Sequence, residues 1–290
     1  MKKIINGWKN LPQKTKKIVY ISTGVTILLV GIFLLIMWIT VWSWETVPSE
    51  DEQRDEYYGS CDLVVMSIQG DIVGYAPLPE SGETDEFAPV EDIIYELEHI
   101  EEQNFPVIVL DITSWGGNFA PAKELADFIA QMKTPVVVSI REAGLSGGYY
   151  IASQADEVFA APFSDVGSIG VTMSYLDESR VNEKQGYVWN SLSTGIFKDA
   201  GSPEKPLTSA ERALFERDLK TLHETFVADV ARGRNLPLAT VQALADGSSV
   251  LAERALELKL IDGVKHQWDV IKYVQEKYDL DDTICWQTGE

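Results

Sequence analysis

The apolar positions of the chain first predict a parallel sheet. The segments DLVVMSI (62–68), PVIVLDI (106–112) and TPVVVSI (134–140) are almost continuously apolar, as strands covered on both faces are. Between them, VEDIIYELEHI (90–100) and AKELADFIAQM (122–132) repeat apolar side chains at the spacing of a helix with one buried face. Strands and helices that alternate in this order predict an α/β fold with a mostly parallel sheet and right-handed crossovers.

The second half of the domain carries weaker strand signals and one long helical segment. Three short strands are predicted, at EVFAA (157–161), SIGVTMSYL (168–176) and YVWNSL (187–192). Residues 208–234 predict a long helix, because Thr208 and Glu211 have the spacing of a capping box at its start. Shorter helices complete a helical carboxyl-terminal part.

The amino-terminal part has a different pattern, an apolar run that no charge interrupts. Residues 18–44 contain no charged side chain and are long enough to cross about 30 Å of hydrocarbon as one transmembrane helix. The lysines of residues 1–17 place this basic tail in the cytoplasm, so the domain would lie on the extracytoplasmic side of the cell membrane. A cleaved signal peptide is the alternative, but its apolar region is shorter, about 7–15 residues.

Charge and cysteine content narrow the picture further. The formal net charge is −21, and all of the acidic side chains lie beyond residue 44, which argues against nucleic acid as a partner. Residues 45–61 are acidic and poor in aliphatic side chains, and we interpret them as a solvated linker before a domain at 62–290. Cys61 and Cys285 would lie in a compartment that permits disulfides, but two cysteines near opposite ends of a domain say little about pairing, and we expect two unpaired thiols.

Two glycine-rich loops follow predicted strands at the sheet edge where α/β proteins place their sites. The first contains Gly116 and Gly117, and the second contains Ser146 followed by Gly147 and Gly148. A nucleophilic serine needs an exposed turn, a base and hydrogen-bond donors for an oxyanion, and glycines at a helix start supply the turn and the donors. A serine before a helix is also a common helix cap, so a purely structural role is the alternative.

The base is harder to find from the residues alone. His99 and His223 fall inside predicted helices and His266 follows a turn, so none of the three histidines suits a catalytic triad. No histidine or cysteine cluster has the spacing of a metal site, and no cofactor is expected. A lysine can serve as the base when it is neutral, but composition and spacing nominate no particular lysine.

Three segments together resemble a known family of enzymes. GLSGGYYIASQADEVFAAPFSDVGSIGV (144–171), the earlier DITSWGG (111–117) and the later STGIFKDAGSPEKPLTSAER (193–212) are similar to the signal peptide peptidase A family, also called protease IV. Its members are membrane-bound Ser/Lys peptidases, and the similarity extends over about residues 62–265 with the motifs in the family's order.

This resemblance implies a role for each matching residue. Ser146 would be the nucleophile and Lys198 its general base, and Ser168 would orient the lysine. The backbone N–H groups of Gly117 and Gly147 would form the oxyanion hole. Asp199 follows the lysine, and we expect its carboxylate to point away from that amine.

The same resemblance implies a substrate groove formed by Trp115, Gly116 and Gly148. The family commonly has Ser-Pro-Gly-Gly where this chain has Ser114-Trp115-Gly116-Gly117. Proline would preset the turn, whereas tryptophan leaves it freer and adds a large ring, so we expect this change to affect the substrate profile.

The resemblance also implies an α/β spiral like that of the crotonases and the Clp peptidase. Proteins of this length would assemble into homo-oligomeric rings in which the serine of one protomer meets the lysine of its neighbour. The expected substrates are released signal peptides and other apolar segments near the bilayer. The alternatives are an acyl-CoA enzyme of the crotonase type, a catalytically silent membrane scaffold, and a peptidase that clips stomatin-like membrane proteins.

Overall fold

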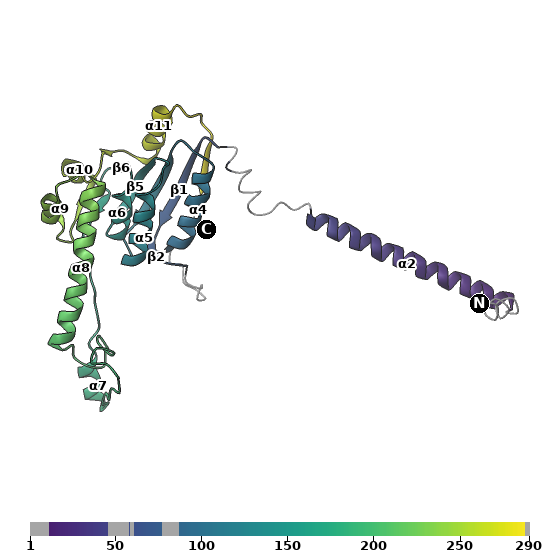
Figure 1. Ribbon diagram of the computed structural model, residues 1–290, viewed down its shortest axis with the longest axis horizontal. Coiled ribbons are helices and arrows are strands. Elements are labelled where there is room, and N and C mark those ends of the chain that lie inside the picture. The colour runs from purple at the N-terminus through teal and green to yellow at the C-terminus, as the bar shows by residue number, and fades with distance from the viewer. Residues whose placement is uncertain (1–11, 46–57, 59–60, 77–86, 288–290) are drawn as a thin grey trace. The chain divides into compact units, whose positions relative to one another are not determined.

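The structure is a computed structural model that describes residues 12–45, 58, 61–76 and 87–287. The chain divides into two units, residues 1–56 and 57–290. The first contains helix α2 (Gln13–Glu45), which Figure 1 draws in purple. Among the described residues we find no helix whose length and apolarity suffice for a membrane crossing. Most of the predicted basic tail and acidic linker lies outside the described residues.

The second unit is built on a mostly parallel sheet, as the sequence predicted. Its main strand order is β10-β1-β4-β5-β6-β9, and these neighbours all pair in parallel. The strands are β1 (Leu63–Gln69), β4 (Ile108–Ser114), β5 (Val136–Leu145), β6 (Glu157–Ala160), β9 (Gly263–Val264) and β10 (Ile284–Gln287). Each strand that was predicted from a continuous apolar run between residues 62 and 140 is present. This confirms an α/β fold.

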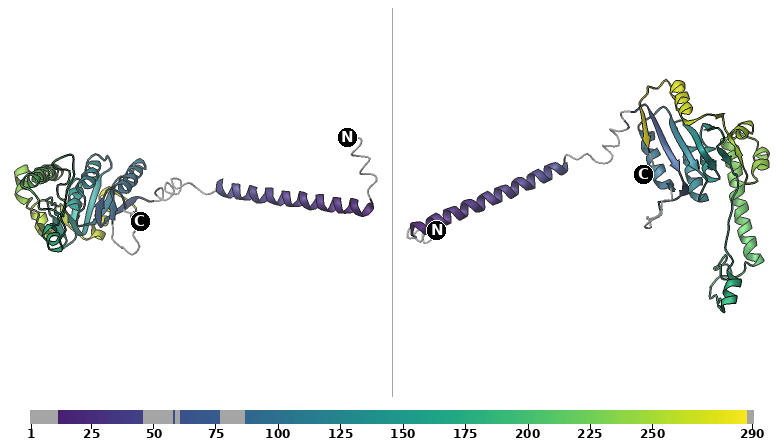
Figure 2. Two further views of the ribbon diagram at one scale, coloured as in Figure 1. Left: turned by 90° about the horizontal axis from the view of Figure 1, so that it is seen from below. Right: turned by 180° about the vertical axis from the view of Figure 1, so that it is seen from behind.

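Helices cover both faces of this sheet (Figure 2). On one face lie α4 (Val90–Glu102), α5 (Phe119–Ile129) and α6 (Gly147–Ala152), whose apolar side chains join the larger core. On the other face α11 (Gln267–Tyr278) packs Val270, Ile271 and Val274 against the sheet. Alternate residues of each strand contribute to the two cores, which explains why these strands are apolar throughout.

Short strands and helices lie near the glycine-rich loops. These elements are β2 (Asp71–Val73), β3 (Phe87–Pro89), β7 (Asp165–Gly167), β8 (Ser249–Leu251), α9 (Leu238–Leu244) and α10 (Ala252–Glu257). Strands β7 and β8 extend the main sheet, because β7 pairs in parallel with the end of β5 and antiparallel with β8, whereas β2 and β3 form a separate two-stranded sheet. These strands are too short to leave a period in the sequence, so we did not predict them at these bounds.

Residues 172–208, which we call the arm, differ from the prediction. The arm contains α7 (Ser179–Gln185) and leads into α8 (Ser209–Gly233), and Figure 1 shows α7 at the end of α8 away from the sheet. The predicted strands at 168–176 and 187–192 are wrong, because the arm offers their apolar residues no neighbouring strand. The capping box of Thr208 and Glu211 at the start of α8 is confirmed.

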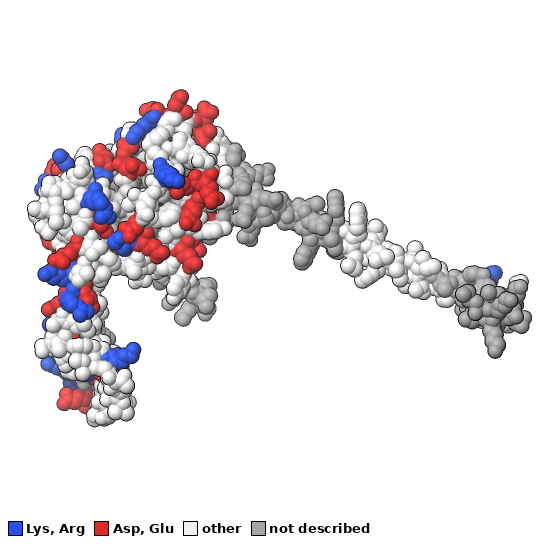
Figure 3. Space-filling view, viewed as in Figure 1, with Lys and Arg blue, Asp and Glu red and all other residues white. Residues whose placement is uncertain are grey.

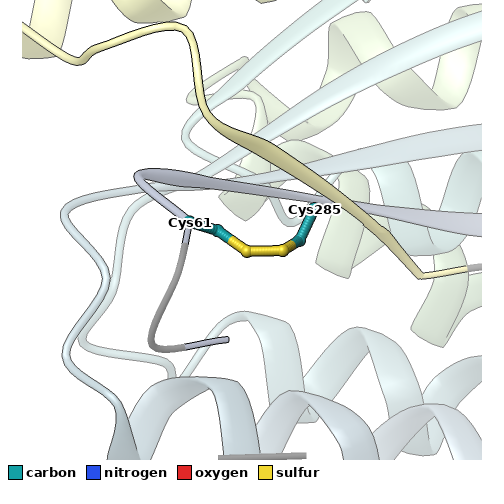
Figure 4. The surroundings of a disulfide bond; sticks show 2 residues. All are labelled: Cys61 and Cys285. Atoms are coloured by element: carbon teal, nitrogen blue, oxygen red, sulfur yellow. A yellow bond between two sulfur atoms is a disulfide. The ribbon is translucent and has the colours of Figure 1, made fainter. Parts of the chain in front are cut away.

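The two cysteines form a disulfide, which corrects the expectation of unpaired thiols. Cys61 lies two residues before β1, and Cys285 lies in β10, the parallel neighbour of β1 (Figure 4). Their Cα atoms are 5.7 Å apart, which is the usual spacing for a disulfide. No local pattern predicts this pairing, because the two cysteines are 224 residues apart in the sequence and meet only where β10 joins the sheet beside β1.

Candidate active site

Ser146 lies at the junction where β5 ends and α6 begins. Its backbone has φ 50° and ψ −118°, a conformation that residues with a side chain seldom adopt. The Ser146 N–H donates to the Gly167 carbonyl at 2.8 Å, and the Ser146 carbonyl accepts from the Tyr150 N–H at 2.8 Å. The side chain makes no capping hydrogen bond to α6, so the alternative of a plain helix cap does not describe this serine.

The Gly116–Gly117 turn approaches Ser146 from the neighbouring loop. A Cβ atom at Gly116 would lie 2.8 Å from the Ser146 Cβ and 3.1 Å from its Oγ, so only glycine allows this approach. Ser114 shapes the turn, because its Oγ donates to the Gly70 carbonyl at 2.7 Å and accepts from the Gly116 N–H at 3.1 Å. Both glycines have positive φ, 117° and 151°.

The backbone N–H of Gly117 points away from Ile72 in β2, the strand beside it. Ile72 donates to the Gly116 carbonyl at 2.9 Å and accepts from the Asn118 N–H at 2.8 Å. In a parallel bridge of this kind, the N–H of the middle residue, here Gly117, points to the opposite side. Gly147 is the first residue of α6, where the N–H has no partner within the helix. Two N–H groups are therefore available beside Ser146.

Most of the predicted site residues share one cavity of about 630 Å³. Trp115, Gly117, Ser146, Gly147 and Ser168 all line it. The rest of the lining includes apolar side chains from α5, α6 and α8, namely Phe119, Ala122, Tyr150 and Phe226. Gly148 instead packs against the backbone of Ser114, where an added Cβ would lie 3.0 Å from the carbonyl oxygen.

Ser168 occupies a second strained turn, with φ 53°. Its Oγ donates to the Gly247 carbonyl at 3.0 Å, and its N–H donates to the Ser248 carbonyl at 3.0 Å. These bonds fix the hydroxyl at the wall of the cavity that contains Ser146. The oxygen keeps its lone pairs available for another donor.

Lys198 is separate from this group of residues. It is exposed on the arm, and of the described residues, those that line the cavity do not include it. The neighbouring Asp199 carboxylate lies 3.6 Å from the Lys205 amine, and hydrogen bonding to Ser191 lowers the Asp199 pKa. The arm exposes large apolar side chains around the lysine: Tyr187, Val188, Leu192, Ile196 and Phe197. A single protomer therefore does not bring Lys198 to Ser146.

The cavity lining also includes His223, whose sequence context argued against a catalytic base, and Asp246, which the sequence did not single out. His223 precedes Phe226 by three residues, so both lie on the inner face of α8. A usable signal for His223 is present in the sequence, because this histidine interrupts an apolar stripe that continues through Phe226 and Val230. Asp246 accepts from the N–H and Oγ of Ser248, and these bonds lower its pKa.

A buried network holds α6, which begins next to Ser146, against α8. Tyr150 stacks on Phe226 with ring centroids 4.4 Å apart, and its hydroxyl donates to Asp229. Asp229 also lies 2.7 Å from the Arg232 guanidinium and 3.6 Å from the Lys123 amine. Burial and the Asp229 carboxylate raise the pKa of Tyr150 above its usual value, so the hydroxyl stays a donor.

Comparison with known proteins identifies relatives of this chain. The model of peptidase family S49 matches residues 129–281, which include Ser146, Ser168 and Lys198. A protein of Enterococcus faecium provisionally named signal peptide peptidase SppA is 28% identical over 240 residues, 80% of this chain and 68% of that protein. The chloroplastic serine protease SPPA of Arabidopsis thaliana is 30% identical over 169 residues, which are 57% of this chain and 25% of that protein. Protease 4 of Haemophilus influenzae is 26% identical over 219 residues, which are 73% of this chain and 34% of that protein.

Proposed function

The chain is a member of peptidase family S49, and from this premise we propose that it is a serine endopeptidase whose nucleophile is Ser146. The observation that supports this best is the shared cavity of Ser146, Gly117 and Gly147. The serine Oγ would attack the peptide carbonyl carbon, and the two glycine N–H groups would stabilise the oxyanion that forms. The C–N bond then breaks to leave an acyl-enzyme, which water hydrolyses.

Lys198 of a neighbouring copy would be the general base. Its amine would take the Ser146 proton during attack and donate it to the leaving amine. The exposed apolar side chains of the arm support this arrangement, because a second copy that covers them would also enclose Lys198. A dry environment lowers the pKa of an amine, as a lysine base requires. Ser168 would accept a hydrogen bond from this amine and orient it.

The proposed substrates are signal peptides and other apolar peptide segments. Tyr150, Phe226, Phe119 and Ala122 offer an apolar surface in the cavity for a substrate side chain. Trp115, which is 59% exposed, would pack on the peptide near the scissile bond. The name of the Enterococcus faecium relative agrees with this class of substrate.

We further propose that residues 18–44 anchor the protein in the cell membrane, with the domain on the extracytoplasmic side. The basis is the uncharged sequence of this segment and the lysines before it. The Cys61–Cys285 disulfide supports the placement of the domain, because disulfides persist mainly in oxidising compartments.

Peptide hydrolysis by the purified full chain tests the proposal. We expect the wild type to cleave a signal-peptide mimic and the Ser146→Ala variant to be inactive while it assembles to the same size. Failure of an assembled wild type to cleave the mimic or casein would contradict the proposal and favour a scaffold. Turnover of an acyl-CoA ester in place of peptides would favour the crotonase alternative.

A further inference from the structure

The face of the sheet beneath α11 changes from apolar to charged along its strands. Val107, just before β4, and Val109 in β4 lie on this face and are followed by Asp111. In β5 the corresponding side chains are Val137, Ser139 and then Arg141. Asp111 is 1% exposed and is directly paired in register with Ser139. A carboxylate this deep in a sheet is costly, so its presence requires a physical reason.

Asp111 has one charged partner, on the neighbouring strand. The Arg141 Nη1 donates to Asp111 Oδ2 at 3.3 Å, and the Arg141 side chain is 50% exposed. Among the described residues, no hydrogen bond to Asp111 Oδ1 is formed. From α11, the Gln267 amide lies near enough to lower the pKa of Asp111. The carboxylate is thus directed at the arginine rather than satisfied on all sides.

The Asp111–Arg141 ion pair lies where the register between β4 and β5 becomes irregular. Ile112 is in register with Ile140, but the next pair is Ser114 with Gly144, so β5 contains extra residues that begin at Arg141. Past this bulge β5 leaves β6 and pairs with β7, and the Ser146 N–H bonds to Gly167. Bulges near active sites redirect the side chains that follow them.

Both strands run from this pair directly to the site. Asp111 lies three residues before Ser114, which shapes the Gly116–Gly117 turn, and Arg141 lies five residues before Ser146. We propose that Asp111 and Arg141 are positioning residues that hold the β5 bulge and thereby set Ser146 relative to Gly117. The inference rests on the proposed role of Ser146 as nucleophile.

The charge balance around Asp111 agrees with a functional origin for the pair. Burial raises the pKa of Asp111 to about 6, and the Arg141 guanidinium only partly opposes this effect. At pH 8 the Asp111 carboxyl is ionised, and because its pKa is higher in the folded protein, this ionisation lowers the free energy of unfolding. The ionised form is nevertheless the one that pairs with Arg141. Residues that reduce stability at a site are typical of positions that serve activity.

Asp111→Asn separates the positioning role from a structural one, because activity and stability should change in opposite directions. We expect kcat on a signal-peptide mimic at pH 8 to fall at least about tenfold with KM within about twofold, since a displacement of about 1 Å can cost ~100-fold. The Tm at pH 8 should rise by about 2–4 °C or more. The rate of fluorophosphonate labelling should fall in parallel with kcat.

Arg141 and a second ion pair provide the controls. Arg141→Met should lower kcat by a similar factor and should also lower the Tm. Arg141→Lys should retain part of the activity that Arg141→Met loses. The double variant Asp111→Asn/Arg141→Met should have a kcat no lower than that of either single variant. Asp262→Asn, which removes the partner of Arg234 at 2.8 Å, should lower the Tm and leave kcat unchanged.

An unchanged kcat in Asp111→Asn, or a loss confined to KM, would overturn the positioning role. Ser146→Ala distinguishes this from failure of the proposed function. If Ser146→Ala retains hydrolysis, the nucleophile is misassigned and the proposed function fails. If it is inactive and Asp111→Asn keeps full kcat, only the positioning role fails.

Discussion

Asp199 and Lys205 pair across the base of the arm, with the carboxylate Oδ1 3.6 Å from the amine. Lys205 also contacts Glu211 at the start of α8, so this network fixes the chain directly after Lys198. The pairing agrees with the expectation that Asp199 points away from the neighbouring lysine. It leaves Lys198 exposed, with no ion pair to a described residue.

Lys198→Met should therefore remove nearly all peptide hydrolysis while the protein stays folded. Methionine keeps the length and apolar stem of the side chain but cannot accept the Ser146 proton. Lys184→Met provides a matched control, because Lys184 is another exposed lysine of the same arm, in α7. Initial rates at pH 8 should fall by at least ~100-fold for Lys198→Met and stay within about twofold for Lys184→Met.

Mixing two inactive variants tests whether neighbours share the dyad. Ser146→Ala supplies an intact lysine and Lys198→Met an intact serine, so a mixed oligomer contains complete sites at some interfaces. We expect the mixture to regain a substantial fraction of wild-type activity after subunits exchange. Activity that stays absent although mass measurements show mixed oligomers would place both residues of a working dyad in one protomer.

Gly117→Ala should abolish activity through the oxyanion hole. A Cβ at this position would lie 2.3 Å from the Ile72 carbonyl oxygen, and φ is 151°, so the turn must move. Loss of one oxyanion donor typically lowers kcat by ~100–1000-fold. Gly186→Ala is the control, since Gly186 also has positive φ, 80°, but no atom lies within 4 Å of its added Cβ. Its kcat should match the wild type.

Removal of the disulfide should destabilise the domain without altering the chemistry. Cys61→Ser/Cys285→Ser frees β10 from the start of β1, and the free energy of unfolding should fall by about 2–5 kcal/mol. Urea unfolding in the absence of reductant measures the difference. Dithiothreitol should lower the wild-type midpoint and leave the double variant unaffected, and a wild-type midpoint that dithiothreitol does not change would contradict a stabilising disulfide.

The stability of the arm base should decrease in acid because of Glu211. Its bond to Lys205, and then its bonds to Thr208, lower the Glu211 pKa to about 2 from 4.5. A lowered carboxyl pKa stabilises the fold above the unfolded value, and this contribution is lost as pH falls from about 4.5 toward 2. Glu211→Gln should thus have a lower Tm than the wild type at pH 7, and the gap should close by about pH 2.

The sequence predicted the features that depend on local pattern. The buried strands from Leu63 to Leu145 and the capping box of Thr208 leave clear signals in neighbouring residues, and the structure confirms them. The predicted site residues other than Lys198 lie in or next to one cavity, because parallel strands end at the same edge of a sheet.

Features that depend on distant contacts could not be predicted in this way. The apolar residues at 187–192 suggested a strand, but an apolar segment that faces outward on an arm has the same composition as a buried strand. The disulfide, the place of His223 on the cavity wall and the bulge at Arg141 arise from contacts between distant segments, and periodicity does not encode such contacts.

The central claim is that Ser146 is the residue that attacks the peptide bond, and covalent labelling tests it most directly. The full-length protein is treated with a fluorophosphonate at pH 8, digested and mapped by mass spectrometry. We predict a single adduct, on Ser146, and none in Ser146→Ala. An adduct on another residue, or peptide hydrolysis that persists in Ser146→Ala, would contradict the claim.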